Sequence, residues 1–298
     1  GFSLWGDLYL FDRIIIVDWS AASAPSGKSP KANAIWIGQA DRAGARANYF
    51  STRQAAEQAL MAQVQSGARL LIGFDFPLGF PMGFGKAFLG SDDPCALWHW
   101  VRDHITDGPD NRNNRFMVAQ SVNLAFEQSH AQRGPFWGCP RGLNLTGLSA
   151  TKTSDYAALG FLEKRQCEVL LPKSQPIWKL YTAGSVGSQS LMGLGMIARL
   201  VARGAAVWPF ERNISQSQVV LTEVYPSLID SAVARAVGAG QIKDAAQTQL
   251  LAQALNHMMQ VHQLAQLFEA APKTDQVHSE GWILAQGHQA ALLAALEG

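Results

Sequence analysis

Cysteine is scarce in this sequence, with only Cys95, Cys139 and Cys167 among 298 residues. The three lie far apart and no C-x-x-C pair occurs, which excludes both a zinc ribbon and a disulfide framework. We therefore expect three reduced thiols, as is usual in the cytoplasm. The seven histidines form no H-x-x-x-H pair, so a histidine metal site is not predicted either.

Long apolar runs and an excess of one charge are also missing. No stretch approaches the ~20 apolar residues that cross a bilayer, and the N-terminus lacks a secretory-signal pattern. We therefore expect a cytoplasmic protein with no membrane partner. The formal net charge is +1, which argues against a protein that coats nucleic acid through a basic face. Two kinds of partner are left: a small phosphorylated ligand, or a nucleic acid held locally.

Hydrophobic residues make up 48% of the chain, and their spacing predicts the fold. Short β-branched runs at 12–18, 33–37 and 47–52 indicate three strands, and residues 53–65 show helical spacing. A fourth strand is expected in "RLLIGF", and further strands in "IWKLY", "AAVWPF" and "VVLTEVYP". Because the meander comes before the strand–helix alternation, we predict an α/β fold. Its mixed sheet has a three-strand meander, then parallel strands, with helices on both faces.

Residues 84–176 differ from the rest, since they hold many Trp, Asn, Gly and Pro residues. They are predicted to form a helical and irregular insertion in a single domain, residues 1–298, whose core is 10–83 and 177–298. A long amphipathic helix is expected at about 243–267, and a last one around "WILAQGHQAALLAAL". This order of elements is that of the RNase H-like topology.

The segment "IIIVDWSAASAPSGKS", residues 14–29, resembles a strand that leads into a phosphate-binding loop. A P-loop requires G-x-x-x-x-G-K-[ST] and a helix that begins at the lysine. Here Ala22 occupies the first glycine position, and Pro30 precedes another predicted strand. The segment is therefore predicted to be a connection between two strands, with Lys28 in solvent.

Asp18, Asp75 and Glu223 each stand at or near the end of a predicted strand. An aspartate in such a place often bonds only to loop amides. If the three strands are parallel neighbours, however, their carboxylates meet at one edge of the sheet. Clustered carboxylates without His or Cys suit a hard cation, Mg²⁺ or Mn²⁺. These three residues are the predicted metal ligands and, with Asp244, the predicted catalytic residues.

Asp244 has two interpretations. It stands at the start of the long predicted helix with Gln247 three residues on, a pattern typical of a helix N-cap. It is also placed to complete the acidic site or to position a water molecule.

The segment "TAGSVGSQSLMGLG", residues 182–195, is glycine-rich and enters a helix. Its amides are candidates for phosphate binding, with Ser185, Gly187 and Ser188 as the residues concerned. Glycines that permit close packing are the other interpretation. Lys179 upstream is either a phosphate partner or solvated, and Ser20, two residues after Asp18, is a further candidate for substrate binding.

The segments "VDWSAA", "GFDFPLGFP", "WKLYTAGSVGSQSL", "VWPFE", "TEVYPSL", "KDAAQT" and "EGWILA" occur in this order. The chain thereby resembles a family of uncharacterised RNase H-like proteins that carry I-D-x-P-x-G and E-V-Y/H-P segments. Some relatives are labelled molybdopterin guanine dinucleotide synthesis proteins. The resemblance implies an RNase H-like fold, acidic positions at Asp18, Asp75, Glu223 and Asp244, and an R-x-x-E element at Arg165 and Glu168. Arg165 is the sixth candidate for substrate binding.

Three hypotheses follow. The leading one is a metal-dependent hydrolase or phosphoryl-transfer enzyme acting on a nucleotide or nucleic acid. The second is a kinase or nucleotidyltransferase that holds nucleotide phosphates with Asp18, Ser20 and the 182–188 loop. The third is a non-catalytic scaffold that binds a ligand, in which Asp244 is only a cap.

Overall fold

The computed structural model describes residues 10–297, so the N-terminal segment considered for a secretory signal lies largely outside it. A six-stranded mixed sheet forms the centre, in the order β3-β2-β1-β4-β6-β5. The strands are β1 (Arg13–Asp18), β2 (Ile35–Asp41), β3 (Gly44–Phe50), β4 (Leu70–Phe74), β5 (Ala206–Val207) and β6 (Val219–Glu223). The first three pair antiparallel, whereas β1, β4, β6 and β5 run parallel. This is the predicted meander followed by parallel strands, and it is consistent with an RNase H-like sheet.

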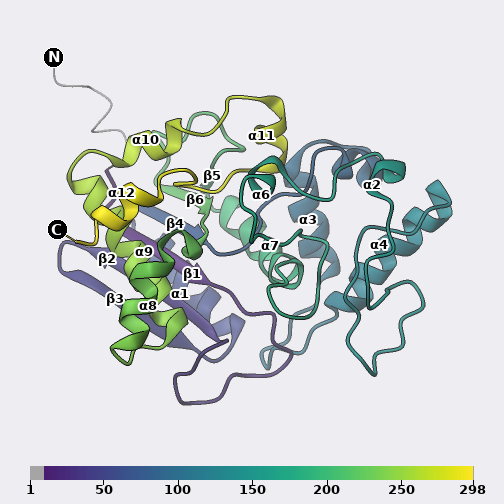
Figure 1. Cartoon of the computed structure of the whole chain (residues 1–298), viewed down its shortest axis with the longest axis horizontal. Coiled ribbons are helices and arrows are strands. Elements are labelled where there is room, and N and C mark those ends of the chain that lie inside the picture. The colour runs from purple at the N-terminus through teal and green to yellow at the C-terminus, as the bar shows by residue number, and fades with distance from the viewer. Residues whose placement is uncertain (1–9, 298) are drawn as a thin grey trace.

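Helices cover both faces of the sheet, as predicted (Figure 1). On one face lie α8 (Asp230–Gly238), α9 (Lys243–Gln260), α10 (Leu264–Glu269) and α12 (Gln289–Ala294), and on the other α1 (Arg53–Gln65) and α7 (Gly187–Val201). Two further helices, α3 (Pro94–His104) and α4 (Arg115–His130), pack against α7 in the same core. The remaining helices are α2 (Phe84–Leu89), α5 (Tyr156–Leu159), α6 (Gln166–Val169), α11 (Asp275–Glu280) and a 3₁₀ helix at Pro226–Ile229.

Successive residues of the central strands point into two separate apolar cores. Ile15 and Val17 of β1 pack in the core beneath α7, while Ile14 and Ile16 pack in the core beneath α9. The helix α9 lies directly on β1, β2 and β3, and a Cβ at Gly38 would overlap the backbone of Thr248. Gly38 therefore allows α9 to approach the sheet closely. This approach also sets the position of Asp244, which lies in the first turn of α9.

Some helices and strands of the structure differ in extent from the predicted ones. The helix expected at 243–267 is two helices, because the chain turns at His262, whose φ of 57° lies in the left-handed region. The strand expected in "IWKLY" is absent; within the described residues Lys179 makes only an isolated bridge to Trp137. No helix begins at Lys28, which is exposed, so the P-loop interpretation is excluded.

The 84–176 segment forms helices α2 to α6 and long loops, with no strand in its described residues, and it lies beside the sheet together with α7 (Figure 1). The three cysteines are unpaired. Between residues 10 and 297, no helix is long and apolar enough to span a membrane.

Candidate functional site

A cavity of about 730 Å³ opens at the carboxyl ends of β1, β4 and β6. Its walls come from the connections after these strands, the start of α9, the 182–188 loop and the first turn of α7. Every segment quoted above for the family resemblance contributes a lining residue except "VWPFE". The position is the one expected for a ligand site in an open α/β sheet.

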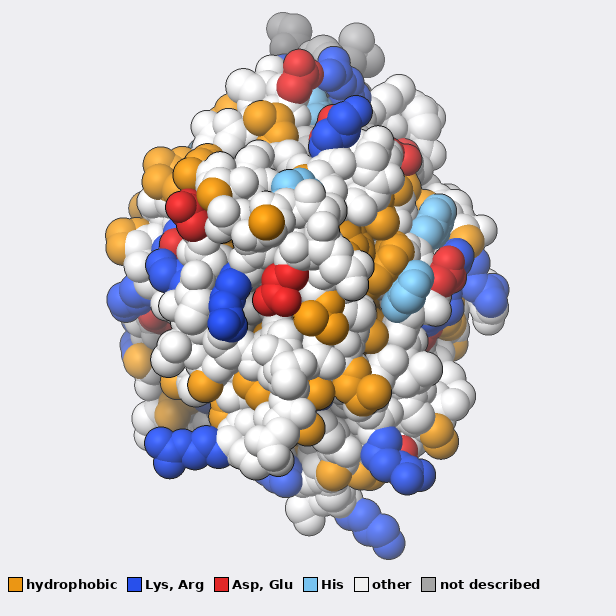
Figure 2. Space-filling view, turned by 90° about the vertical axis from the view of Figure 1, so that its right-hand side faces the viewer, with side chains coloured by type: hydrophobic (Ala, Val, Ile, Leu, Met, Phe, Trp, Pro, Cys, Tyr) orange, Lys and Arg blue, Asp and Glu red, His pale blue; other side chains and the backbone are white. Residues whose placement is uncertain are grey.

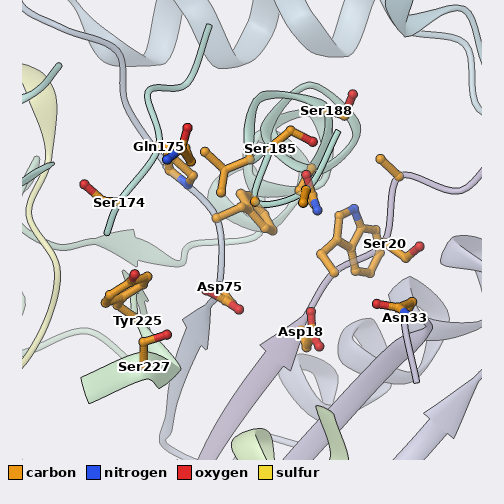
Figure 3. A pocket seen from close by; sticks show the side chains of 18 of the residues that line it. Asp18, Ser20, Asn33, Asp75, Ser174, Gln175, Ser185, Ser188, Tyr225 and Ser227 are labelled. Atoms are coloured by element: carbon orange, nitrogen blue, oxygen red, sulfur yellow. The ribbon is translucent and has the colours of Figure 1, made fainter. Parts of the chain in front are cut away.

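Asp18 and Asp75 follow in-register positions of two adjacent parallel strands. Val17 pairs with Phe74, and the Asp75 N–H donates to the Val17 carbonyl at 2.9 Å. Both aspartate side chains therefore point toward the α9 face and line the cavity (Figure 3). Among the described residues, no side chain or amide donates a hydrogen bond to either carboxylate. Both side chains are half-buried, so their oxygens are open to the cavity and available to a ligand.

The surroundings of this pair disfavour two negative charges. Burial and the Asp244 carboxylate raise the pKa of Asp18 well above its usual value, and Lys243 only partly opposes this. Burial also raises the pKa of Asp75, together with the charges of Asp18, Glu223 and Asp244. Without a cation in the cavity, the pair is therefore expected to hold extra protons.

This pair should make the metal-free protein less stable as the pH rises. The usual aspartate value of 3.8 applies to the unfolded chain, so above about pH 4 the folded state binds more protons than the unfolded state. The free energy of unfolding therefore falls until the raised folded-state pKa values are passed. We expect the melting temperature measured in EDTA to fall more steeply with pH for the native protein than for the double variant Asp18→Asn, Asp75→Asn. Parallel profiles would contradict this account.

Glu223 is not a third member of the pair. It is in register with Phe74 at the end of β6, so it points to the face opposite Asp18 and Asp75. Both of its oxygens accept hydrogen bonds of 2.7 Å from Arg165, and the Leu78 N–H also donates to it. Glu223 also lines the cavity, but alternation along the strand turns its carboxylate to a guanidinium, so the structure does not bring it together with the two aspartates as a third metal ligand.

Arg165 lines the cavity, but its guanidinium is bound by carboxylates of the protein. It is 0% exposed, and besides Glu223 it donates to Glu168, whose carboxylate also accepts from the Arg165 N–H at 2.9 Å at the start of α6. One of its Nη atoms also reaches the Glu280 carbonyl at 3.2 Å. The predicted R-x-x-E element is thus the point at which the insertion is joined to β6 and to the C-terminal region.

Asp244 lies in the first turn of α9, but it does not cap the helix. The N-cap position is Ile242 and has no side-chain cap bond. Instead, one Asp244 oxygen accepts a 2.5 Å hydrogen bond from the N–H of Asn33 in the β1–β2 connection. Asp244 is buried at the cavity wall, on the same face as Asp18 and Asp75, so the ligand interpretation is favoured over the cap.

The 182–188 loop lies on the other side of the cavity from the aspartates, with Ser185 and Ser188 as lining residues (Figure 3). Gly187 does not line the cavity. Its N–H donates to the Lys179 carbonyl, and a Cβ there would overlap the Ile177 carbonyl, so it is a packing glycine. Lys179 does not line the cavity either. Its ammonium donates to the Ala183 carbonyl at 2.9 Å, so it stabilises the 182–188 loop.

Ser20 lines the cavity, and its hydroxyl accepts from the Ala22 N–H at 3.2 Å. The connection that carries it is held by Arg53, the first residue of α1, which donates to the carbonyls of Ser20 and Ala22. Arg53 also makes a two-bond ion pair with Asp107 of the insertion. The position of Ser20 is therefore determined by a buried arginine far from it in sequence.

Apart from Arg165, sequence reasoning missed the cationic residues of the cavity. Arg115, at the start of α4, lines it while being only 8% exposed, and Lys173 and Lys243 line it as exposed side chains. A single arginine in "DNRNNR" has no distinguishing sequence pattern, because what sets it apart is its burial. Lys243 could have been noted as the neighbour of Asp244.

No His or Cys is among the described residues that line the cavity. In the same part of the chain, no group of three or more His, Cys, Asp or Glu side chains is close enough to hold a metal ion by itself. Comparisons of the chain with protein-family models, with curated proteins and with solved structures found no match. The family resemblance therefore stays a prediction, and the cavity is the feature of the molecule that bears on function.

Proposed function

We propose that this protein is a divalent-metal-dependent phosphoryl-transfer enzyme or hydrolase acting on a nucleotide or another phosphate-containing substrate. The observation that carries the proposal is the pair Asp18 and Asp75: two carboxylates in register, on one face, in a cavity, with no hydrogen-bond donor to either among residues 10–297. Their raised pKa values have the same cause, namely burial beside other carboxylates.

The donor set suits Mg²⁺ or Mn²⁺. Mg²⁺ is commonly held by one or two carboxylates, with water and substrate phosphate oxygens completing the octahedron, so a third protein ligand is not required. Asp18 and Asp75 would hold the ion, which when bound would stabilise negative charge on a phosphoryl oxygen. Asp244 uses one oxygen for the Asn33 N–H, which leaves the other to orient a water molecule or a substrate hydroxyl.

A small substrate is favoured over a long nucleic acid. The cavity volume of about 730 Å³ lies within the range of small-molecule sites, roughly 300–1,000 Å³. On the face of the molecule seen in Figure 2, the Lys and Arg side chains are scattered singly and do not form a basic stripe. Single-strand binding would require a continuous positively charged groove.

The experiment is a thermal-unfolding and phosphate-release assay on the native protein and the variant Asp18→Asn. We expect Mg²⁺ or Mn²⁺ to raise the melting temperature of the native protein and to support hydrolysis of simple phosphate esters. The variant should lose the metal-induced rise and roughly a hundredfold or more in rate. Asp110→Asn is the matched control, because Asp110 is exposed, pairs only with Arg112, and lies outside the cavity. A native protein that neither ion stabilises would refute the proposal.

A further inference from the structure

Arg115 is a buried cation without a carboxylate partner. Its guanidinium donates to the Ser188 hydroxyl at 3.0 Å and to Ser23 and Asn113, all neutral acceptors, and its ring contact is Phe116 at 4.3 Å. Within residues 10–297 no acceptor meets its Nη2 atom, and no Asp or Glu forms an ion pair with it. A nearly buried charge in a protein is normally paired or bound to a ligand.

The nearby charged side chains do not neutralise the positive charge of Arg115. Burial lowers the pKa of Arg115 to about 10, and the neighbouring Arg53 contributes to the decrease. The Asp107 carboxylate opposes the decrease, but it gives both of its oxygens to Arg53, at 2.7 and 2.6 Å. Arg115 remains protonated at neutral pH, so the wall of the cavity around it carries a positive charge that the protein does not neutralise.

The first turn of α7 adds donors at the same place. Ser188, which accepts from Arg115, is the second residue of this 15-residue helix. The N–H groups of Ser188 and Gln189 meet no acceptor among the described residues, and both residues line the cavity. Free amides and the positive end of a helix dipole attract an anion.

From these observations we infer that Arg115 and the first turn of α7 form a subsite for a terminal phosphate group, and that the substrates are small phosphomonoesters. The guanidinium forms a fork that matches two phosphate oxygens. Because Arg115 is nine-tenths buried, only the end of a ligand reaches it, whereas a phosphodiester inside a polymer would need room for chain on both sides. The inference rests on the proposed function for the chemistry at Asp18 and Asp75, but phosphate binding at Arg115 does not depend on it.

The test is calorimetric titration of the protein with inorganic phosphate in EDTA, followed by a nucleoside monophosphate and a dinucleoside phosphodiester. We expect the native protein to bind phosphate and the monophosphate, and to bind the diester more weakly. Arg115→Gln should weaken phosphate binding roughly ten- to a hundredfold, as expected for charged hydrogen bonds. Arg112→Gln is the matched control, since Arg112 lies in the loop just before α4 but is exposed and pairs with Asp110; it should bind like the native protein.

Two further variants keep the inference testable. If Arg115→Gln does not fold, Arg115→Lys retains the charge without the fork and should bind phosphate several-fold more weakly. Asp18→Asn should keep phosphate binding in EDTA while losing the metal effect, so a failure of the metal proposal is distinguishable from a failure of this one. Equal affinity of native, Arg115→Gln and Arg115→Lys proteins, absence of phosphate binding, or tighter binding of the diester would overturn the inference.

Discussion

Replacing Asp75 with asparagine should make the metal-free protein more stable and, at the same time, remove the proposed metal-dependent activity. The side chain accepts no hydrogen bond from the described residues, and burial together with Asp18, Glu223 and Asp244 raises its pKa. Asparagine has nearly the same shape and no charge. The substitution therefore relieves the cost of a buried charge without creating a hole in the wall of the cavity.

We expect a gain of about 1 kcal/mol in EDTA at neutral pH, or roughly 1–2 °C in melting temperature. The metal-induced rise should disappear, and the rate should fall roughly a hundredfold or more. Stability gained where activity is lost is typical of residues kept for function rather than for folding. Differential scanning fluorimetry with and without Mn²⁺, together with a phosphate-release assay, gives both quantities.

The comparison with Asp18→Asn sharpens this prediction. Because each aspartate raises the energy of the other, the double variant should be less stable than the sum of the two single effects implies. An Asp75→Asn protein that is less stable than the native one in EDTA would show that the carboxylate is a structural group, and would argue against the proposed site.

Replacing Arg165 with methionine should have the opposite effect and strongly destabilise the protein. The change leaves Glu168 and Glu223 buried, at 2% and 4% exposure, without the guanidinium that donates to both. Breaking a buried ion pair from one side typically costs about 3–5 kcal/mol. A loss of this size is a large part of the stability of an ordinary domain.

Urea unfolding of Arg165→Met measures this loss directly. Arg102→Met is the matched control, because Arg102 pairs with Asp103 on the surface, where both side chains are exposed, and such pairs contribute about 0–1 kcal/mol. The triple variant with Glu168→Gln and Glu223→Gln should recover part of the loss, since neutral amides are less costly to bury than carboxylates. A change below about 1 kcal/mol in Arg165→Met would show that the network does not hold the insertion against the sheet.

Some of the site follows from local patterns. Asp18 and Asp75 end short β-branched runs, and the sequence predicts both the strand ends and their common edge. Glu223 was expected beside them for the same reason. Its register on β6 turns it to the other face, and a one-residue difference in register reverses the direction of a side chain.

The break between α9 and α10 was also beyond local reasoning. The amphipathic pattern continues past residue 260, yet the chain adopts a left-handed conformation at His262 and starts a new helix at Leu264. The residues on both sides of His262 favour a helix, so the sequence gives no sign of the interruption. Tertiary packing overrides helix propensity here.

By itself the sequence determined the mixed sheet, its covering helices and the two aspartates at its edge, because strand and helix periodicity and turn residues are local properties. Only the tertiary structure decided that Glu223 is bound by Arg165, that Asp244 accepts from Asn33 rather than capping α9, and that Arg115 is buried without a carboxylate partner. These pairings join segments up to 211 positions apart. Burial and charge balance arise only when such segments meet, so no local pattern encodes them.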